Sequence, residues 1–170
     1  MHTCIKTQRL TLRAMEEKDT ERILDLLTDQ EIAKNYMLPD FAQREDALPL
    51  AKRMIELTQD DSRIVTGVDL NGEIIGWLNE TGKENGSIEL GYIINPKHHN
   101  CGFCSEALGA LITWLFANGF DRVFCGAFEE NPASLRVMEK CGMQPMSFTE
   151  ELEYRGRTHT VLYREILKNA

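Results

Sequence analysis

The residues between Ser87 and Ser105 have the types and spacing of an anion-binding loop. An apolar run, SIELGYIIN, ends at Asn95, a polar loop with Gly102 near its end follows, and a helical pattern begins close to Cys104. A glycine-bearing loop between a strand and a helix N-terminus presents backbone N–H groups to an anion. We therefore expect this loop to hold the pyrophosphate of a nucleotide-like cofactor.

Cys101 and Cys104 allow other interpretations of the same loop. C-x-x-C at the start of a helix is also a redox motif, because the helix N-terminus lowers the pKa of the first thiol. With His98 and His99, the segment HHNCGFC also has the ligand types of a zinc site. A structural zinc site usually takes its second ligand pair from another segment, and the remaining cysteines form no such pair. We favour the interpretation that Cys101 and Cys104 are small loop residues without redox chemistry, and we predict no metal site.

A second patterned segment, NPASLRVMEKCGM, begins at Asn131. Asn131 suits the N-cap of a helix and Pro132 its first turn, while Gly142 suits its end. Such caps fit any helix. What caps alone do not explain is that this segment follows the Gly102 loop further along the same chain.

Together the two segments resemble the GCN5-related N-acetyltransferases (GNAT superfamily). The family's acyl-CoA loop has Arg or Gln, then Gly, then Gly or Ala, where this chain has His99, Gly102 and Cys104. The second segment follows the family pattern at Asn131, Ser134, Lys140, Gly142 and Met143, with Met138 where many relatives have Tyr. The flanks ELGYIINP and SEALGALITWLF, with QRLTLRAMEEKD near the N-terminus, resemble the branch that acetylates ribosomal-protein N-termini (RimJ/RimL-like).

The resemblance implies an α/β GNAT fold over one domain, residues 1–170. Its sheet would be mixed and mostly antiparallel, with flanking helices and a central parallel pair, 87–95 and 121–128, that splays apart. Acetyl-CoA would insert its pantetheine arm near Tyr92 to Asn95, with its pyrophosphate on the amides of 99–105. The implied cofactor-binding residues are Tyr92, Ile93, Ile94, Asn95, His99, Asn100, Cys101, Gly102, Phe103, Cys104, Ser105, Asn131, Ser134 and Lys140.

The implied reaction is direct attack of a primary amine on the thioester in a ternary complex. The amine must lose a proton first, and Glu89, an acid in an otherwise apolar strand, is the candidate base. The backbone N–H of Ile93 or a neighbour would stabilise the oxyanion. Ser134, or a water, would protonate the leaving thiolate. The alternative for Glu89 is a solvent-side strand residue, and for Ser134 a first-turn helix residue.

The acceptor is a protein N-terminus or a small amine, and the sequence does not choose between them. By family topology, the acceptor pocket would be lined by Tyr36, Met37, Phe41 and Tyr154. We expect a monomer or homodimer, core or rim positions for Trp77 and Trp114, and a structural role for His159.

Composition bounds the protein class. The chain has 170 residues, 42% of them hydrophobic, and a net charge of −8, which argues against nucleic acid and anionic membranes as partners. No apolar run approaches the roughly 20 residues that span a bilayer. The N-terminal residues lack an apolar signal core, so we expect a cytoplasmic protein.

Hydrophobic periodicity and turn residues predict the elements that must position these side chains. The two Asn-Gly pairs, at 71–72 and 85–86, predict hairpin turns. Asp19 is expected to cap the first helix. The expected strands are 5–14, the two runs around 71–72, 87–95, 121–128 and a hairpin in 145–167 turning at 155–157, and the expected helices are 20–29, 30–37, 43–58, 104–118 and one from 132 toward 142.

Two alternative functions stay open. A dithiol oxidoreductase would use Cys101 and Cys104, but neither the antiparallel strands before the motif nor the second segment fits that class. A non-catalytic acyl-CoA-binding protein would keep the loop and lose the base, against which Glu89 argues. Thiol titration and thermal shift with acetyl-CoA would separate the three.

Overall fold

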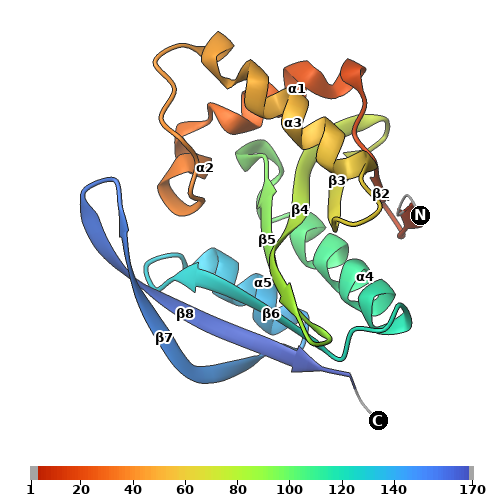
Figure 1. Ribbon diagram of the computed structural model, residues 1–170, viewed down its shortest axis with the longest axis vertical. Coiled ribbons are helices and arrows are strands. Elements are labelled where there is room, and N and C mark those ends of the chain that lie inside the picture. Colours follow the sequence, from red (N-terminus) through yellow and green to blue (C-terminus); the bar gives the residue numbers. More distant parts are fainter. Residues whose placement is uncertain (1–3, 169–170) are drawn as a thin grey trace. The chain divides into compact units, whose positions relative to one another are not determined.

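The computed structural model describes residues 4–168 as an α/β protein with one mixed sheet (Figure 1). The strands are β1 (Ile5–Lys6), β2 (Thr11–Arg13), β3 (Val65–Leu70), β4 (Glu73–Glu84), β5 (Ser87–Ile94), β6 (Arg122–Phe128), β7 (Gln144–Tyr154) and β8 (Arg157–Leu167), in the sheet order β1-β2-β3-β4-β5-β6-β8-β7. The helices are α1 (Thr20–Leu27), α2 (Gln30–Asn35), α3 (Leu48–Gln59), α4 (Phe103–Ala117) and α5 (Pro132–Lys140). The sheet is mostly antiparallel, with β5 and β6 parallel, so the predicted fold class is confirmed.

The chain divides into two compact units. Unit 1 holds the residues up to Asn79 together with Tyr92–Ala110, and unit 2 holds Glu80–Gly91 and the residues from Leu111 onward.

Two predicted Asn-Gly turns are confirmed. Asn71 and Gly72 have φ angles of 55° and 92°, and Asn85 and Gly86 have 49° and 77°. Positive φ at both central residues is the type I′ geometry, whose twist matches that of the flanking strands. Local sequence therefore fixes both turns that lead into β5.

In unit 1, α1 packs beside α3 (Figure 1). Their apolar faces form a cluster with Ile32, Trp77 and Ile93. These three residues come from three further elements. The buried members are Met15, Ile23, Leu24, Leu26, Leu27, Ile32, Leu38, Ala47, Ala51, Ile55, Ile74, Trp77 and Ile93. The predicted core position of Trp77 is thus confirmed.

The expectation of one opening strand over 5–14 is wrong. Thr7 N–H donates to the Leu10 carbonyl (2.9 Å), and Leu10 N–H donates to the Thr7 hydroxyl (2.9 Å), which closes a turn. The chain therefore reverses, and Ile5 of β1 pairs antiparallel with Leu12 of β2. The expected helix over 43–58 is likewise split, into a 3-10 turn, Arg44–Ala47, and α3, with Pro49 in the first turn of α3.

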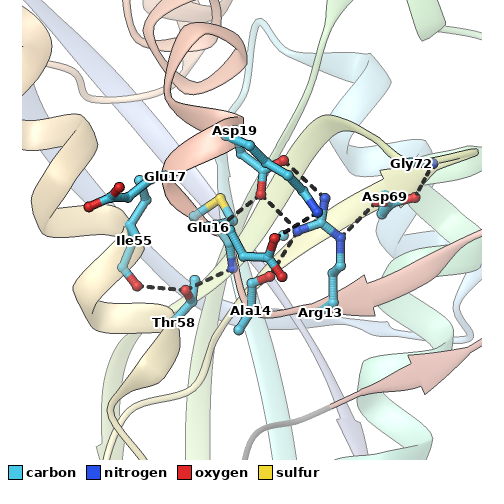
Figure 2. A network of polar contacts seen from close by, with 12 residues as sticks. Arg13, Ala14, Glu16, Glu17, Asp19, Ile55, Thr58, Asp69 and Gly72 are labelled. Atoms are coloured by element: carbon cyan, nitrogen blue, oxygen red, sulfur yellow. Dashed lines mark hydrogen bonds and ion pairs between the residues drawn. The ribbon is translucent and has the colours of Figure 1, made fainter.

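Asp19 precedes α1, but it does not cap that helix with its side chain. Its carboxylate accepts hydrogen bonds from Arg13 Nη1 (2.7 Å), Arg13 Nη2 (3.0 Å) and the Glu16 N–H (2.8 Å) (Figure 2). Arg13 Nε also donates to Asp69 (2.7 Å), so one guanidinium joins β2, β3 and the start of α1. A charged partner competes with the helix N–H groups for the carboxylate, which corrects the predicted cap.

The Arg13 network makes unit 1 sensitive to loss of Asp19. Burial acts to raise the pKa of Asp19, but the hydrogen bonds from Arg13 and Glu16 and the charge of Arg13 hold it below its ordinary value. Breaking one partner of a buried pair costs up to about 3–5 kcal/mol. We expect Asp19→Asn to lower the free energy of unfolding by an amount toward that range at pH 7, as measured by urea unfolding.

The matched control is Asp25→Asn, because Asp25 pairs with Arg44 at the surface with its side chain 45% exposed. A loss of about 0–1 kcal/mol is expected there. Since the pKa of Asp19 is lowered on folding, its contribution is present above its unfolded pKa and disappears as the pH falls. The gap between wild type and Asp19→Asn must therefore narrow in acid, and equal losses for both variants would contradict the assignment.

In unit 2, β7 and β8 form a long curved hairpin, and β8 pairs with β6 (Figure 1). The parallel ladder of β5 and β6 joins Ser87–Glu89 to Arg122–Phe124. Helix α5 packs on one face of the strands, where Cys125, Met138 and Met143 are buried. Phe124, paired with Glu89, lies on the face opposite Cys125, because side chains alternate along a strand.

Candidate active site

The predicted anion-binding loop lies in unit 1, between β5 and α4. Asn95 accepts a hydrogen bond from the N–H of Lys97 (3.0 Å) and begins a 3-10 turn, Pro96–His98, that the sequence did not predict. Asn100 and Gly102 have φ angles of 60° and 79°. A Cβ on Gly102 would lie 3.4 Å from Arg9 Nη2 and would be strained at that φ. The loop thus needs glycine at 102. It leads directly into α4, so the backbone amides of the first turn of α4 lie at the end of the loop.

His99 turns back toward the strand. Its ring Nε2 lies 2.9 Å from the carbonyl oxygen of Ile94, a distance suited to an N–H donor. The resemblance expected that part of β5 to pair with the pantetheine arm. The side chain of His99 therefore contacts the end of β5.

Close packing also fixes β5 at Ile93. A Cβ on Gly76 of β4 would lie 2.1 Å from the Ile93 carbonyl oxygen, so no side chain fits at position 76. Asn95 N–H donates to the Ile75 carbonyl (2.7 Å), which holds the next part of the chain. Sequence analysis missed Gly76; the glycine inside the apolar run EIIGWL was the available signal.

Arg9 binds the loop from the N-terminal segment, which sequence analysis also missed. Its Nη1 donates to the Cys101 carbonyl (2.9 Å), and its Nε donates to Glu106 (2.7 Å). Its Cζ lies 4.5 Å above the centroid of the Phe103 ring. Thr7 Oγ1 also donates to Glu106 (2.5 Å), so the turn between β1 and β2 grips the start of α4.

Glu89 lies in unit 2 on β5 and is half-buried. Burial raises the pKa of Glu89, a hydrogen bond from Thr81 acts to lower it, and the charge of Glu150 acts to raise it. A carboxylate with a raised pKa is a stronger base toward an ammonium group than an ordinary one. The environment of Glu89 therefore fits the predicted role.

Glu150 and Tyr163 form a pair close to Glu89 in unit 2. Tyr163 Oη donates to Glu150 Oε2 (2.8 Å). Burial and the charges of Glu150 and Glu89 raise the pKa of Tyr163. The hydroxyl therefore stays protonated and donates a hydrogen bond. A Cβ on Gly126 would lie 2.7 Å from the Tyr163 ring, so glycine at that position leaves room for tyrosine.

Asn131 caps α5 as predicted. Its Oδ1 accepts from the Ser134 N–H (3.2 Å), which holds both residues at the start of the helix in unit 2. Lys140 is exposed at the last turn of α5. The roles of these three residues toward a cofactor stay predictions.

The residues expected to line an acceptor pocket have different surroundings. Tyr36 Oη donates to Asn79 Oδ1 (2.6 Å), and Tyr36 and Phe41 pack against the core cluster of unit 1. Met37 is 58% exposed. Tyr154 belongs to unit 2, where its ring lies 6.0 Å from that of Phe128.

Cys101 is exposed, Cys104 is half-buried, and neither forms a disulfide. Within residues 4–168, no group of three or more His, Cys, Asp and Glu side chains is placed to hold a metal ion. Across the same residues, no helix has the length and apolar character needed to cross a membrane.

Comparison with known proteins decides the family. Residues 9–144 match the family model described as an acetyltransferase (GNAT) domain.

This chain belongs to the GNAT acetyltransferase family.

Relatives and solved structures agree with this assignment. The chain is 28% identical to the uncharacterized N-acetyltransferase YoaA of Bacillus subtilis (strain 168), covering 93% of this chain and 92% of YoaA. It is 27% identical to YdaF of the same organism, provisionally named a ribosomal N-acetyltransferase, covering 99% and 96%. A GNAT-family acetyltransferase of Bacillus anthracis superposes with a TM-score of 0.83 at 26% identity, covering 97% and 98%.

The RimL ribosomal L7/L12 alpha-N-protein acetyltransferase, solved with coenzyme A, has the same fold, with a TM-score of 0.85 at 21% identity covering 97% and 98%. The predicted GNAT family is therefore confirmed, and the likeness to RimL is a likeness of fold.

The proximity of Glu150 to Glu89 leads to a measurable prediction. We expect Glu150→Gln to lower the pKa of Glu89, because a negative charge that opposes its ionisation is removed. The readout is the titration of the Glu89 carboxyl by carbon-13 NMR. Glu151→Gln is the control, since the neighbouring Glu151 pairs with Thr160 and points to the other face of β7. An unchanged midpoint in Glu150→Gln would show that the two carboxylates do not interact.

Proposed function

We propose that this GNAT protein transfers acetyl from acetyl-CoA to a primary amine by direct attack in a ternary complex. The observation that carries the proposal is the loop before α4, where Gly102 has a positive φ and the chain enters a helix N-terminus. Family membership supports acetyl transfer in general. A dithiol oxidoreductase has no comparable support from the fold or from the family.

The loop residues fit a pyrophosphate. The backbone amides of residues 99–105 would bind it, and the positive end of the α4 dipole would favour its charge. Gly102 is exposed and has no Cβ, so its backbone is accessible to a ligand. Asn131 and Ser134 would bind the remainder of the cofactor, with Tyr92, Ile93 and Ile94 of β5. The cofactor supplies the activated acetyl thioester.

The residues of this chain supply proton transfer. Glu89 would accept a proton from the ammonium form of the acceptor, directly or through one water. The backbone N–H of Ile93 or a neighbour would stabilise the oxyanion. Ser134, or a water, would donate a proton to the leaving thiolate.

The acceptor we favour is a protein N-terminus. Support comes from the names of YdaF and RimL, which are described as ribosomal or L7/L12 N-acetyltransferases. A small amine is the alternative, which a thiol-release screen of peptide and small-amine acceptors would distinguish. Turnover with small amines alone would exclude the protein acceptor.

Gly102→Val tests the pyrophosphate site. A β-branched residue is strained at a φ of 79° and fills the space beside Arg9, so we expect binding of CoA to be abolished. The measurement is isothermal titration with CoA. Gly109→Val is the control, because nothing lies within 4 Å of a Cβ built at Gly109 in α4. Wild-type affinity in Gly102→Val would sink the assignment of this loop.

Glu89→Gln tests the base. Removal of the basic oxygen should lower kcat/KM by about 10²–10⁴-fold near neutral pH, with affinity for CoA nearly unchanged. The defect should shrink at high pH, where the free amine is already abundant. Glu84→Gln, at the exposed end of β4, is the control and should keep wild-type rates. If Glu89→Gln keeps wild-type kcat/KM from about pH 6 to about pH 9, another group is the base.

A further inference from the structure

Arg9 contacts three separate parts of the segment that begins α4. Its Nε and Nη2 both lie 2.7 Å from Glu106 Oε2, and its backbone N–H donates to Glu106 Oε1 (2.9 Å). Its Nη1 donates to the Cys101 carbonyl (2.9 Å), and its guanidinium covers the Phe103 ring. The Arg9 side chain is 42% exposed, so core packing does not explain these contacts.

Glu106 presents a problem for anion binding. It lies in the first turn of α4, where the helix dipole stabilises a carboxylate. The same carboxylate repels a phosphate bound nearby. Burial acts to raise the pKa of Glu106, yet hydrogen bonds from Thr7 and Arg9 and the charge of Arg9 lower it, so the group is ionised. The guanidinium of Arg9 is the cation that offsets this charge.

The bond from Arg9 to Cys101 orients a peptide group. In a planar trans peptide, the carbonyl of one residue and the N–H of the next point in opposite directions. With the Cys101 carbonyl turned toward Arg9, the Gly102 N–H points away from the guanidinium. The amide that follows is therefore held in one orientation before any ligand arrives.

We propose that Arg9 is a positioning residue for the pyrophosphate loop, which neutralises Glu106 and fixes the Cys101–Gly102 peptide so that its N–H serves the anion. This inference rests on the proposed function, because it assigns a task to Arg9 at the same site. Arg9 itself needs no contact with the cofactor.

The test compares two acyl donors in Arg9→Ala. Loss of one charged hydrogen-bonding group should raise the KM for acetyl-CoA and the Kd for CoA by about tenfold to a hundredfold, with kcat within about twofold. S-Acetylpantetheine lacks the phosphates, so its kcat/KM should be unchanged. Arg22→Ala is the control, since Arg22 pairs with Asp25 and Glu73 at the surface.

A second substitution separates positioning from simple anchoring of the N-terminal segment. In Arg9→Ala/Glu106→Gln the uncompensated charge is gone, so part of the CoA affinity should return, although both sides of the contact are removed. Arg9→Lys keeps the charge and loses the fork, and it should fall between wild type and Arg9→Ala. Thermal unfolding identifies any variant that does not fold.

Four outcomes would overturn the inference. Equal losses with both donors, or no recovery in the double variant, would make Arg9 an ordinary structural anchor. Wild-type KM in Arg9→Ala would remove its role altogether. If the wild-type protein itself fails to bind CoA, the proposed function falls together with this inference, whereas a wild type that binds leaves the proposed function standing.

Discussion

The proposed site depends on one constraint, which is that backbone amides would bind the anion. The direction of a backbone N–H does not depend on which side chain its residue carries. It is fixed by the conformation and contacts of the peptide groups around it. In unit 1, that direction is set by the positive φ of Asn100 and Gly102 and by the contact of Arg9 with Cys101. If the amides bind the anion as we propose, the side chains of His99 and Cys104 can differ from the family pattern without loss of the site.

The same unit needs a firm connection between its first strands and its helices. Arg13 joins β2, β3 and the start of α1 through Asp19 and Asp69, and the chain from Thr7 to Leu10 turns so that Arg9 meets α4. Two arginines near the N-terminus therefore act on different parts of unit 1. The first stabilises the packing of the strands, and the second shapes the loop.

Local signals predicted most of the elements. Both Asn-Gly turns and the Asn131 cap depend on residues close together in the chain, so the sequence alone was sufficient for them. The cap at Asp19 failed because Arg13, from another element, takes the carboxylate. Arg9, Gly76 and the bond from His99 to Ile94 were missed because each depends on a close approach that only the folded chain creates.

The family match covers residues 9–144, and the candidate base and loop both lie inside that range. The central claim is that the amides of residues 99–105 bind the pyrophosphate of acetyl-CoA. Its most direct test is a titration of nitrogen-15-labelled protein with CoA, followed by amide chemical shifts. The account predicts saturable shifts that are largest for residues 99–105 and much smaller with pantetheine. Shifts that never saturate, or that are equally large with pantetheine, would contradict it.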